Sequence, residues 1–297
     1  MFRLRRRPAQ PEPLFRGDFV TVCIAAKCPQ LNRIVFVADT MVSSDTISTD
    51  KVMKMRHLGN AARWFALFAG PERRFVPLVE RIHKELGDSP GATVHEVIEA
   101  AQKAWHASHV ELVEREVLGQ LDISLDDCVH NGLQWFGERR HGAMLETIEE
   151  LESHPSFAID LLIAGFDAEN EQHMFELSYS GRIARHANLL FHAVGAGRSA
   201  ALSALYPQPL FSRGTNLNEI IYRMCAAKFA AESAPSVGRD TVVVVVSPDR
   251  QVFHMLFNDV IDKLRVLWKE KGQPPVPEGA DSLIDEQLRK PLRRFDE

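Results

Sequence analysis

The sequence predicts an α+β fold in which two β-sheets stack face to face and helices cover both outer faces, giving a four-layer αββα sandwich. Strands, helices, strands, a helix and again strands follow one another along the 297 residues. Several strand segments are apolar at nearly every position, which is typical of sheets that are buried on both faces. Two helical blocks separated by a second block of strands favour one helical layer outside each sheet.

The first strands are short apolar runs, each ended by a polar, proline or glycine signal. They cover residues 19–26, 33–39 and 64–70. After Pro71 the apolar residues recur at three- and four-residue steps, and the period resumes after a break at 87–91. Further helix is expected around 126–151. The region 71–154 is therefore predicted to be an extended helical segment.

Strands return in the second half, and tails flank the predicted domain. We expect strands at 158–166, 174–179, 184–195, 242–246 and 251–256, with a helix between about 197 and 232. Residues 1–18 are basic and proline-rich and indicate an N-terminal tail. One domain is expected over 19–271, and the proline- and charge-rich residues 272–297 are expected to form a C-terminal tail.

Composition narrows the class of protein. The net charge of −5 at pH 7 offers no broad positive field for nucleic acid, although Arg3, Arg5, Arg6 and Arg7 form a local basic arm. No apolar stretch reaches the roughly 18 to 20 residues that span a bilayer. The sequence therefore predicts a cytoplasmic protein that binds neither nucleic acid nor a membrane.

Cysteine and histidine spacing indicates neither a disulfide framework nor a metal site. Cys23, Cys28, Cys128 and Cys225 are widely separated and form no CxxC pair, so reduced thiols are expected. Among the twelve histidines, His106 and His109 come nearest to a ligand pair, and a helix surface explains both. We expect no metal and no cofactor.

Four early segments form a recognisable series. They are TVCIAAK (21–27), RIVFVADT (33–40), TISTDKVMKM (46–55) and WFALFAGPERRF (64–75). In this order and spacing they resemble the front half of a proteasome β-type or related bacterial subunit, a member of the N-terminal nucleophile hydrolases. Residues 158–181 and 191–205 resemble the second half of the same family. The likeness spans about 19–258 and is strongest before residue 75.

This resemblance implies a threonine-type amide hydrolase. Thr21 would be the nucleophile, and its own α-amine, with a pKa of about 7.7 to 8.0, would be the base. Lys54, held by Asp39, would favour the neutral amine and stabilise negative charge, and the Gly70 N–H would donate to the oxyanion. Taken one at a time, these four residues are ordinary strand, turn or surface residues. The prediction therefore depends on their occurring together in the order and spacing of the family.

The substrate class and the activity have alternatives. Peptides are the favoured substrate, and a small-molecule amide stays open because acylases share this fold. A non-catalytic assembly subunit, with Thr21 still acylated by Val20, is the rival from another class. A partner ATPase also stays open.

The sequence departs from the family pattern at two places next to the predicted nucleophile. Val20 stands where self-processing members carry Gly, and its branched side chain crowds the carbonyl that Thr21 would attack. A bacterial GUG codon at position 20 can start translation, so we expect a protein that begins Met-Thr, ahead of autocleavage or an uncleaved chain. Ala196 stands where a supporting Ser is common.

Further supporting residues are expected near SAPSVGRD (233–240). Ser236 and Gly238 match the family's Asp and Ser-Gly-Gly region, whose Asp is displaced or replaced here. Glu232 or Asp240 is the candidate substitute, with surface acid as the simpler explanation of each.

The resemblance also implies a homo-oligomer, and the helical segment adds an independent reason. Its helices between 71 and 152 carry apolar residues that a monomer would expose in a large patch unless they fold back onto the domain. These residues are Trp105, Leu118, Leu121, Trp135 and Phe136.

Overall fold

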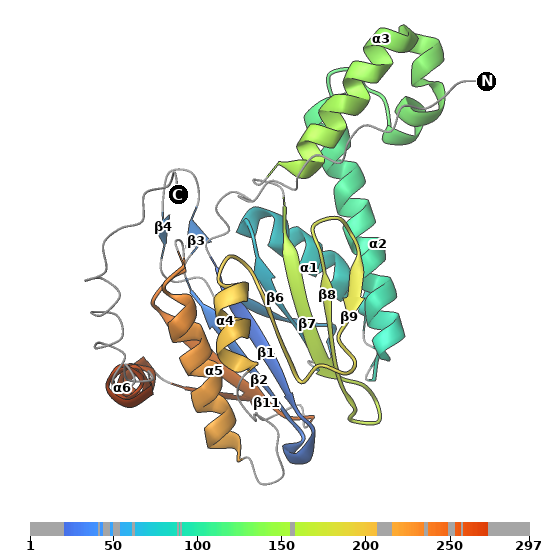
Figure 1. The fold of residues 1–297 in the computed structure, drawn as a ribbon. Coiled ribbons are helices and arrows are strands. Elements are labelled where there is room, and N and C mark those ends of the chain that lie inside the picture. The colour runs from blue at the N-terminus through green and yellow to red at the C-terminus, as the bar shows by residue number, and fades with distance from the viewer. Residues whose placement is uncertain are drawn as a thin grey trace, which may run out of the picture.

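The computed structural model describes residues 21–40, 42–43, 48–49, 54–60, 63–87, 89, 91–154, 158–206, 216–234, 237–248, 253–256 and 258–272. Two five-stranded antiparallel sheets form the centre (Figure 1). The first sheet has the order β10 (Phe191–Val194), β1 (Cys23–Cys28), β2 (Arg33–Asp39), β11 (Thr241–Val246), β12 (Phe253–Met255). The second has the order β5 (Met55–Leu58), β6 (Trp64–Ala69), β7 (Asp160–Phe166), β8 (Gln172–Leu177), β9 (Ile183–Arg185).

Short connections and helices complete the fold. The 3₁₀ turn η1 (Pro29–Leu31) joins β1 to β2, and β3 (Val42–Ser43) pairs with β4 (Ser48–Thr49). The helices are α1 (Glu72–Leu86), α2 (Val94–Val113), α3 (Leu125–Ser153), α4 (Arg198–Leu205), α5 (Leu217–Ala231) and α6 (Asn258–Leu267). Two π-helical turns, η2 (Glu114–Leu118) and η3 (Trp268–Gly272), extend α2 and α6.

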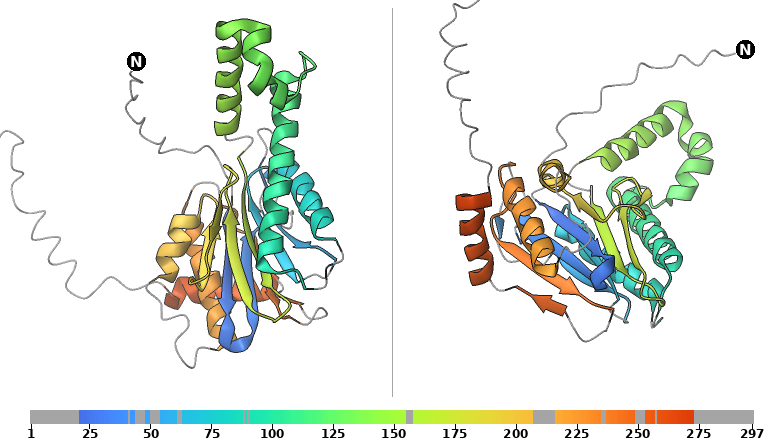
Figure 2. Two further views of the ribbon diagram at one scale, coloured as in Figure 1. Left: turned by 90° about the vertical axis from the view of Figure 1, so that its right-hand side faces the viewer. Right: turned by 60° about the horizontal axis from the view of Figure 1, so that its bottom comes forward.

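Three apolar clusters correspond to the interfaces of a four-layer sandwich, which confirms the predicted α+β fold. The central cluster lies between the sheets and includes Cys23, Phe36 and Leu162. A second joins the first sheet to α4 and α5, and a third joins the second sheet to α1 and α2. Figure 2 shows these layers from two directions. All six residues of β1 are buried, including Lys27, which interrupts its otherwise apolar sequence.

The helical segment ends in a hairpin that projects beyond the sheets (Figures 1 and 2). Gly137 interrupts α3 with φ +75° and ψ 164°, a conformation that favours glycine. The part after the bend folds back, because His141 Nε2 lies 2.9 Å from the carbonyl oxygen of Cys128. Of the five apolar residues expected either to fold back or to meet a neighbouring copy, Leu118 is fully buried within this region, whereas Trp135 is 51% exposed. Leu118 therefore folds back onto the chain and adds nothing to an exposed patch.

Two predicted elements are each divided in two. The prediction of a single strand at 184–195 is wrong, because this region contains β9, which belongs to the second sheet, and β10, which belongs to the first. Residues 186–190 cross between the sheets, which a continuous apolar pattern cannot reveal. The helix expected at 197–232 is α4 followed by α5. The first strand begins at Cys23, and the α6 helix was not predicted.

No helix among the described residues is long and apolar enough to cross a membrane. The two predicted tails lie outside the described residues, apart from Gly272 at the end of η3.

Candidate active site

Thr21 lies immediately before β1, where its neighbours hold both its main chain and its side chain. It is 2% exposed in a chain that still carries residues 1–20. Its carbonyl oxygen accepts the N–H of Gly197 at 3.2 Å. Its Oγ1 accepts a hydrogen bond from Lys54 Nζ. The hydroxyl predicted to be the nucleophile therefore contacts an ammonium group in a buried environment.

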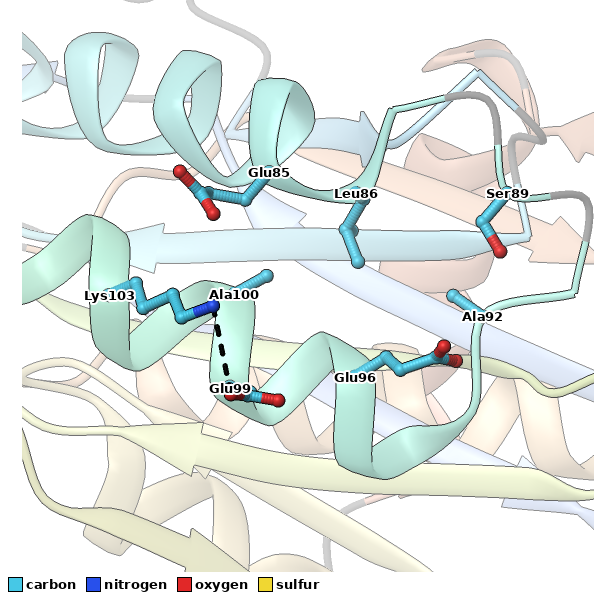
Figure 3. A pocket seen from close by; sticks show the side chains of 8 residues that line it. All are labelled: Glu85, Leu86, Ser89, Ala92, Glu96, Glu99, Ala100 and Lys103. Atoms are coloured by element: carbon cyan, nitrogen blue, oxygen red, sulfur yellow. Dashed lines mark ion pairs between the residues drawn. The ribbon is translucent and has the colours of Figure 1, made fainter.

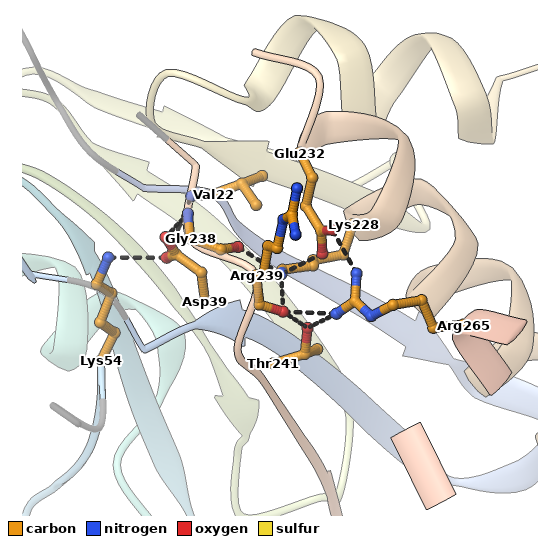
Figure 4. Close-up of polar contacts among 9 residues, drawn as sticks. All are labelled: Val22, Asp39, Lys54, Lys228, Glu232, Gly238, Arg239, Thr241 and Arg265. Atoms are coloured by element: carbon orange, nitrogen blue, oxygen red, sulfur yellow. Dashed lines mark hydrogen bonds and ion pairs between the residues drawn. The ribbon is translucent and has the colours of Figure 1, made fainter. Parts of the chain in front are cut away.

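Lys54 joins Thr21 to the carboxylate at the end of β2. Its Nζ lies 2.7 Å from Asp39 Oδ1, and both side chains are almost completely buried. Asp39 also accepts the Gly238 N–H at 3.0 Å and the Val22 N–H at 3.4 Å. Figure 4 shows the ion pair with the Val22 and Gly238 amides converging on one carboxylate.

Two opposing influences set the pKa of Asp39. Burial raises the pKa of its carboxyl above the ordinary value, while Lys54, the Gly238 N–H and the charge of Lys228 act against that rise. The donors around Asp39 thus offset much of the cost of burying a carboxylate.

Gly70 directly follows β6, at the end of the strand that faces β1 across the central layer. The Cys23 thiol donates to the carbonyl oxygen of Phe68 at 3.3 Å. The φ of Gly70 is +133°, and a Cβ there would lie 2.6 Å from the Ala158 carbonyl oxygen, so only glycine fits. The preceding Ala69 has its Cβ 3.2 Å from the Cβ position that Gly195 lacks. Gly70 is thereby placed at the same end of the sandwich as Thr21.

The four supporting candidates take different positions. Gly238 contacts Asp39 directly, and Ser236 lies outside the described residues. Asp240 has an exposed side chain, and its carbonyl oxygen accepts the Thr40 N–H at 3.3 Å. Glu232 binds Lys228 and Arg265 instead of Thr21 or Lys54. The structure therefore brings together Thr21, Asp39, Lys54 and Gly238, and it leaves Glu232 and Asp240 outside this group.

Lys228 is a buried cation behind the site that the sequence reasoning missed. Its Nζ donates to the carbonyl oxygens of Gly238 at 2.6 Å and Arg239 at 2.9 Å, and lies 2.5 Å from Glu232 Oε1. Arg265 pairs with the same glutamate (Figure 4). Burial lowers the pKa of Lys228 to about 8. This network fixes the turn whose Gly238 N–H reaches Asp39. A lysine between apolar residues, in AAKFAA (226–231), was the available signal.

Gly195 and Gly197 were also missed as parts of the site. Gly195 has φ +95°, and a Cβ there would lie 2.5 Å from the Thr21 carbonyl oxygen. A Cβ on Gly197 would lie 2.8 Å from the Val22 Cβ. The Gly-Ala-Gly sequence after β10 thus lets this turn approach the main chain of Thr21 closely, and its two glycines were the available signal.

A separate concave region lies between α1 and α2, on the outer side of the second sheet (Figure 3). Glu96, which lines it, completes a capping box with Thr93 at the start of α2, and Glu99 pairs with Lys103 at 3.6 Å. Helix capping and a surface ion pair account for these charges.

Comparison with known proteins shows a likeness of structure. No family model and no curated protein matches the sequence. Anbu (ancestral beta-subunit) from Yersinia bercovieri matches with a TM-score of 0.58 and 12% identity, over 93% of this chain and 100% of that one. Anbu from Hyphomicrobium sp. strain MC1 matches at 0.56 and 14%, over 93% and 100%.

A third match is the helical assembly of the Anbu complex from Pseudomonas aeruginosa, with a TM-score of 0.56, 13% identity and coverage of 93% and 99%. Identities this low establish the fold alone. The chain has the αββα fold of these Anbu structures, in agreement with the fold that the sequence resemblance implies.

Proposed function

We propose that the protein is a threonine-type amide hydrolase that acts on peptides through a Thr21 acyl-enzyme. One observation carries this proposal: Lys54 Nζ bonds both to Thr21 Oγ1 and to Asp39 Oδ1 in a buried setting. The buried Thr21 hydroxyl needs a hydrogen-bond partner, but a neutral group would meet that need as well as a lysine does. An ammonium held at its hydroxyl is suited to stabilising negative charge as the oxygen becomes a nucleophile.

The reaction divides the work between main-chain and side-chain groups. The α-amine of Thr21 takes the hydroxyl proton, and Oγ1 attacks the substrate carbonyl carbon. The Gly70 N–H donates to the resulting oxyanion. The protonated amine then gives its proton to the leaving amine, and water hydrolyses the threonyl ester. Lys54 and Asp39 keep a balanced pair of charges beside the attacking oxygen.

This scheme requires a free amine on Thr21. In a chain that contains Val20, that nitrogen forms the amide with Val20, and an amide nitrogen cannot act as the base. We propose that active protein begins at Thr21, through initiation at position 20 followed by methionine removal. The chain that retains residues 1–20 is then the inactive form.

A peptide epoxyketone tests the proposal, because its ketone and epoxide react with a hydroxyl and an amine on the same residue. Protein starting at Thr21 is expected to gain one probe mass, located at Thr21 by peptide mapping. Thr21→Val keeps the side-chain shape without the hydroxyl and should gain none. Thr147→Val, on the exposed face of α3, is the matched control and should still be labelled.

Distinct outcomes separate the alternatives. An unlabelled protein with a verified Thr21 amino terminus would contradict catalysis at Thr21 and favour a non-catalytic assembly subunit. Labelling together with hydrolysis of small amides but not peptides would place the protein among acylases. Labelling of the form that retains residues 1–20 would refute the required free amine.

We also propose that the protein forms a homo-oligomer through the helical segment. Val129, Leu133 and Trp135 on α3 are each more than half exposed, an apolar face that a neighbouring copy would cover. Light scattering should give a multiple of the chain mass, and Leu133→Glu with Trp135→Glu should reduce it. A monomer at high micromolar concentration would contradict the proposal.

A further inference from the structure

Glu176, His186 and His192 form a cluster away from the candidate active site, at the edge where the two sheets meet. Glu176 lies on β8 of the second sheet, and His192 lies on β10 of the first. His186 follows β9, on the segment that crosses between the sheets. We propose that these three residues bind one divalent transition-metal ion, best fitted by Zn²⁺, which fastens the two sheets together.

The ligand atoms already have spacings close to those of a metal site. One ligand atom from each residue lies within 4.8 Å of the others. His192 Nε2 and His186 Nε2 lie 2.8 Å and 3.7 Å from the same oxygen, Glu176 Oε2. Ligands about 2.0 to 2.1 Å from a tetrahedral zinc ion are about 3.4 Å apart. The two distances to Glu176 Oε2 lie on either side of this value, and the two histidine ligand atoms lie within 4.8 Å of each other, so side-chain shifts of up to about 1 Å would complete the site.

An unsatisfied nitrogen atom gives a second, independent argument. Within the part of the chain that the structure describes, His186 Nε2 is buried without a hydrogen-bond partner. A buried polar atom left unpaired costs about 1 to 3 kcal/mol. The His186 nitrogen lies on the Glu176 side, where a metal ion would use its lone pair. His₂Glu is moreover a known zinc ligand set that leaves a fourth position for water.

Neighbouring charges leave one glutamate oxygen for the ion. Arg198 Nη1 donates to Glu176 Oε1 at 3.3 Å, which orients the carboxylate and leaves Oε2 facing both imidazoles. Lys27 Nζ donates to the carbonyl oxygens of His186 at 3.2 Å and Ala187 at 2.8 Å. This lysine holds the crossing segment through its main chain, so it does not occupy the ligand atoms.

The alternative is a metal-free ion pair between Glu176 and protonated histidine. The two imidazole rings have their centroids 3.8 Å apart, so protonating both would place two cations in contact.

Calorimetric titration of the full chain with Zn²⁺ alone, after chelator treatment, tests the proposal. One ion per chain is expected, with a rise in the thermal unfolding midpoint. Glu176→Gln, His186→Gln and His192→Gln should each weaken binding at least tenfold. His173→Gln is the matched control, because it removes an imidazole that pairs with Asp167 at 2.6 Å elsewhere in the second sheet, and it should bind as wild type does.

Cobalt provides a readout that needs no variant. Co²⁺ bound to the wild-type chain should show the intense visible bands of tetrahedral coordination, and one equivalent of Zn²⁺ should remove them. The proposal is overturned if no stoichiometric binding occurs, if the triple variant binds as tightly as wild type, or if the cobalt bands are those of a weak octahedral complex. Far-UV circular dichroism confirms that each variant is folded.

Discussion

The stability losses from removing Asp39 and from removing Lys54 should not add, because each single change leaves the other group buried without its partner. Asp39→Asn leaves a lysine that is 2% exposed without the carboxylate at 2.7 Å, and stranding a buried charge costs about 3 to 5 kcal/mol. Lys54→Met should cost less, about 2 to 3 kcal/mol, because Asp39 keeps the N–H groups of Gly238 and Val22. The double variant leaves no buried charge at this position and should lose only about 2 to 4 kcal/mol.

The double-mutant cycle therefore predicts a coupling free energy of at least about 1 kcal/mol. Urea unfolding at fixed protein concentration, followed by circular dichroism and by the fluorescence of the four tryptophans, measures each variant. Glu99→Gln with Lys103→Met is the control cycle, since this ion pair is exposed and should couple by less than about 0.5 kcal/mol. If the double variant loses as much unfolding free energy as the two single variants together, Asp39 and Lys54 do not form a coupled buried ion pair.

Three further predictions follow from other parts of the structure. The ordinary pKa of a lysine is 10.5, and in the folded protein that of Lys228 is about 8. Between these two pH values the unfolded chain keeps the Lys228 proton while the folded chain has lost it, so raising the pH favours the folded state. From pH 7.5 to 10.5 the free energy of unfolding of the wild type should therefore rise by about 3 kcal/mol relative to that of Lys228→Met. A difference that does not change with pH would contradict this. Gly195→Ala should destabilise by about 2 to 4 kcal/mol through its positive φ and the contact with Thr21, whereas Gly142→Ala, with open space around it, should be neutral or stabilising. Equal unfolding midpoints for these two variants would count against the close approach. Burial raises the pKa of Cys28 and of Cys225 to about 12, and all four cysteines are buried free thiols. Alkylation at pH 8 should therefore label none of the four until urea unfolds the chain. Rapid labelling of the native protein would contradict the burial of these thiols.

Much of the fold could be predicted because it rests on local patterns. The apolar strands β1, β2, β6 and β7 are continuous because both of their faces are covered, and α1 shows a helical period along its buried face. Asp39 and Lys54 were found from their order and spacing around Thr21, and the structure places the three side chains in contact. Their catalytic role stays a prediction until covalent chemistry at Thr21 is measured.

Contacts between distant segments could not be read in the same way. The run 184–195 was expected to be one strand, yet its two ends pair with different sheets, and the crossing between them brings His186 next to His192 and Glu176. Lys228 has no local partner pattern that reveals its bonds to Gly238 and Arg239. Sequence by itself determined the types of element, because periodicity records which faces of a segment are buried, and its resemblance to proteasome β-type subunits indicated Thr21 as the candidate nucleophile. Only the tertiary structure decided which segments share a sheet and which buried charges meet, because those depend on long-range packing that no local period encodes.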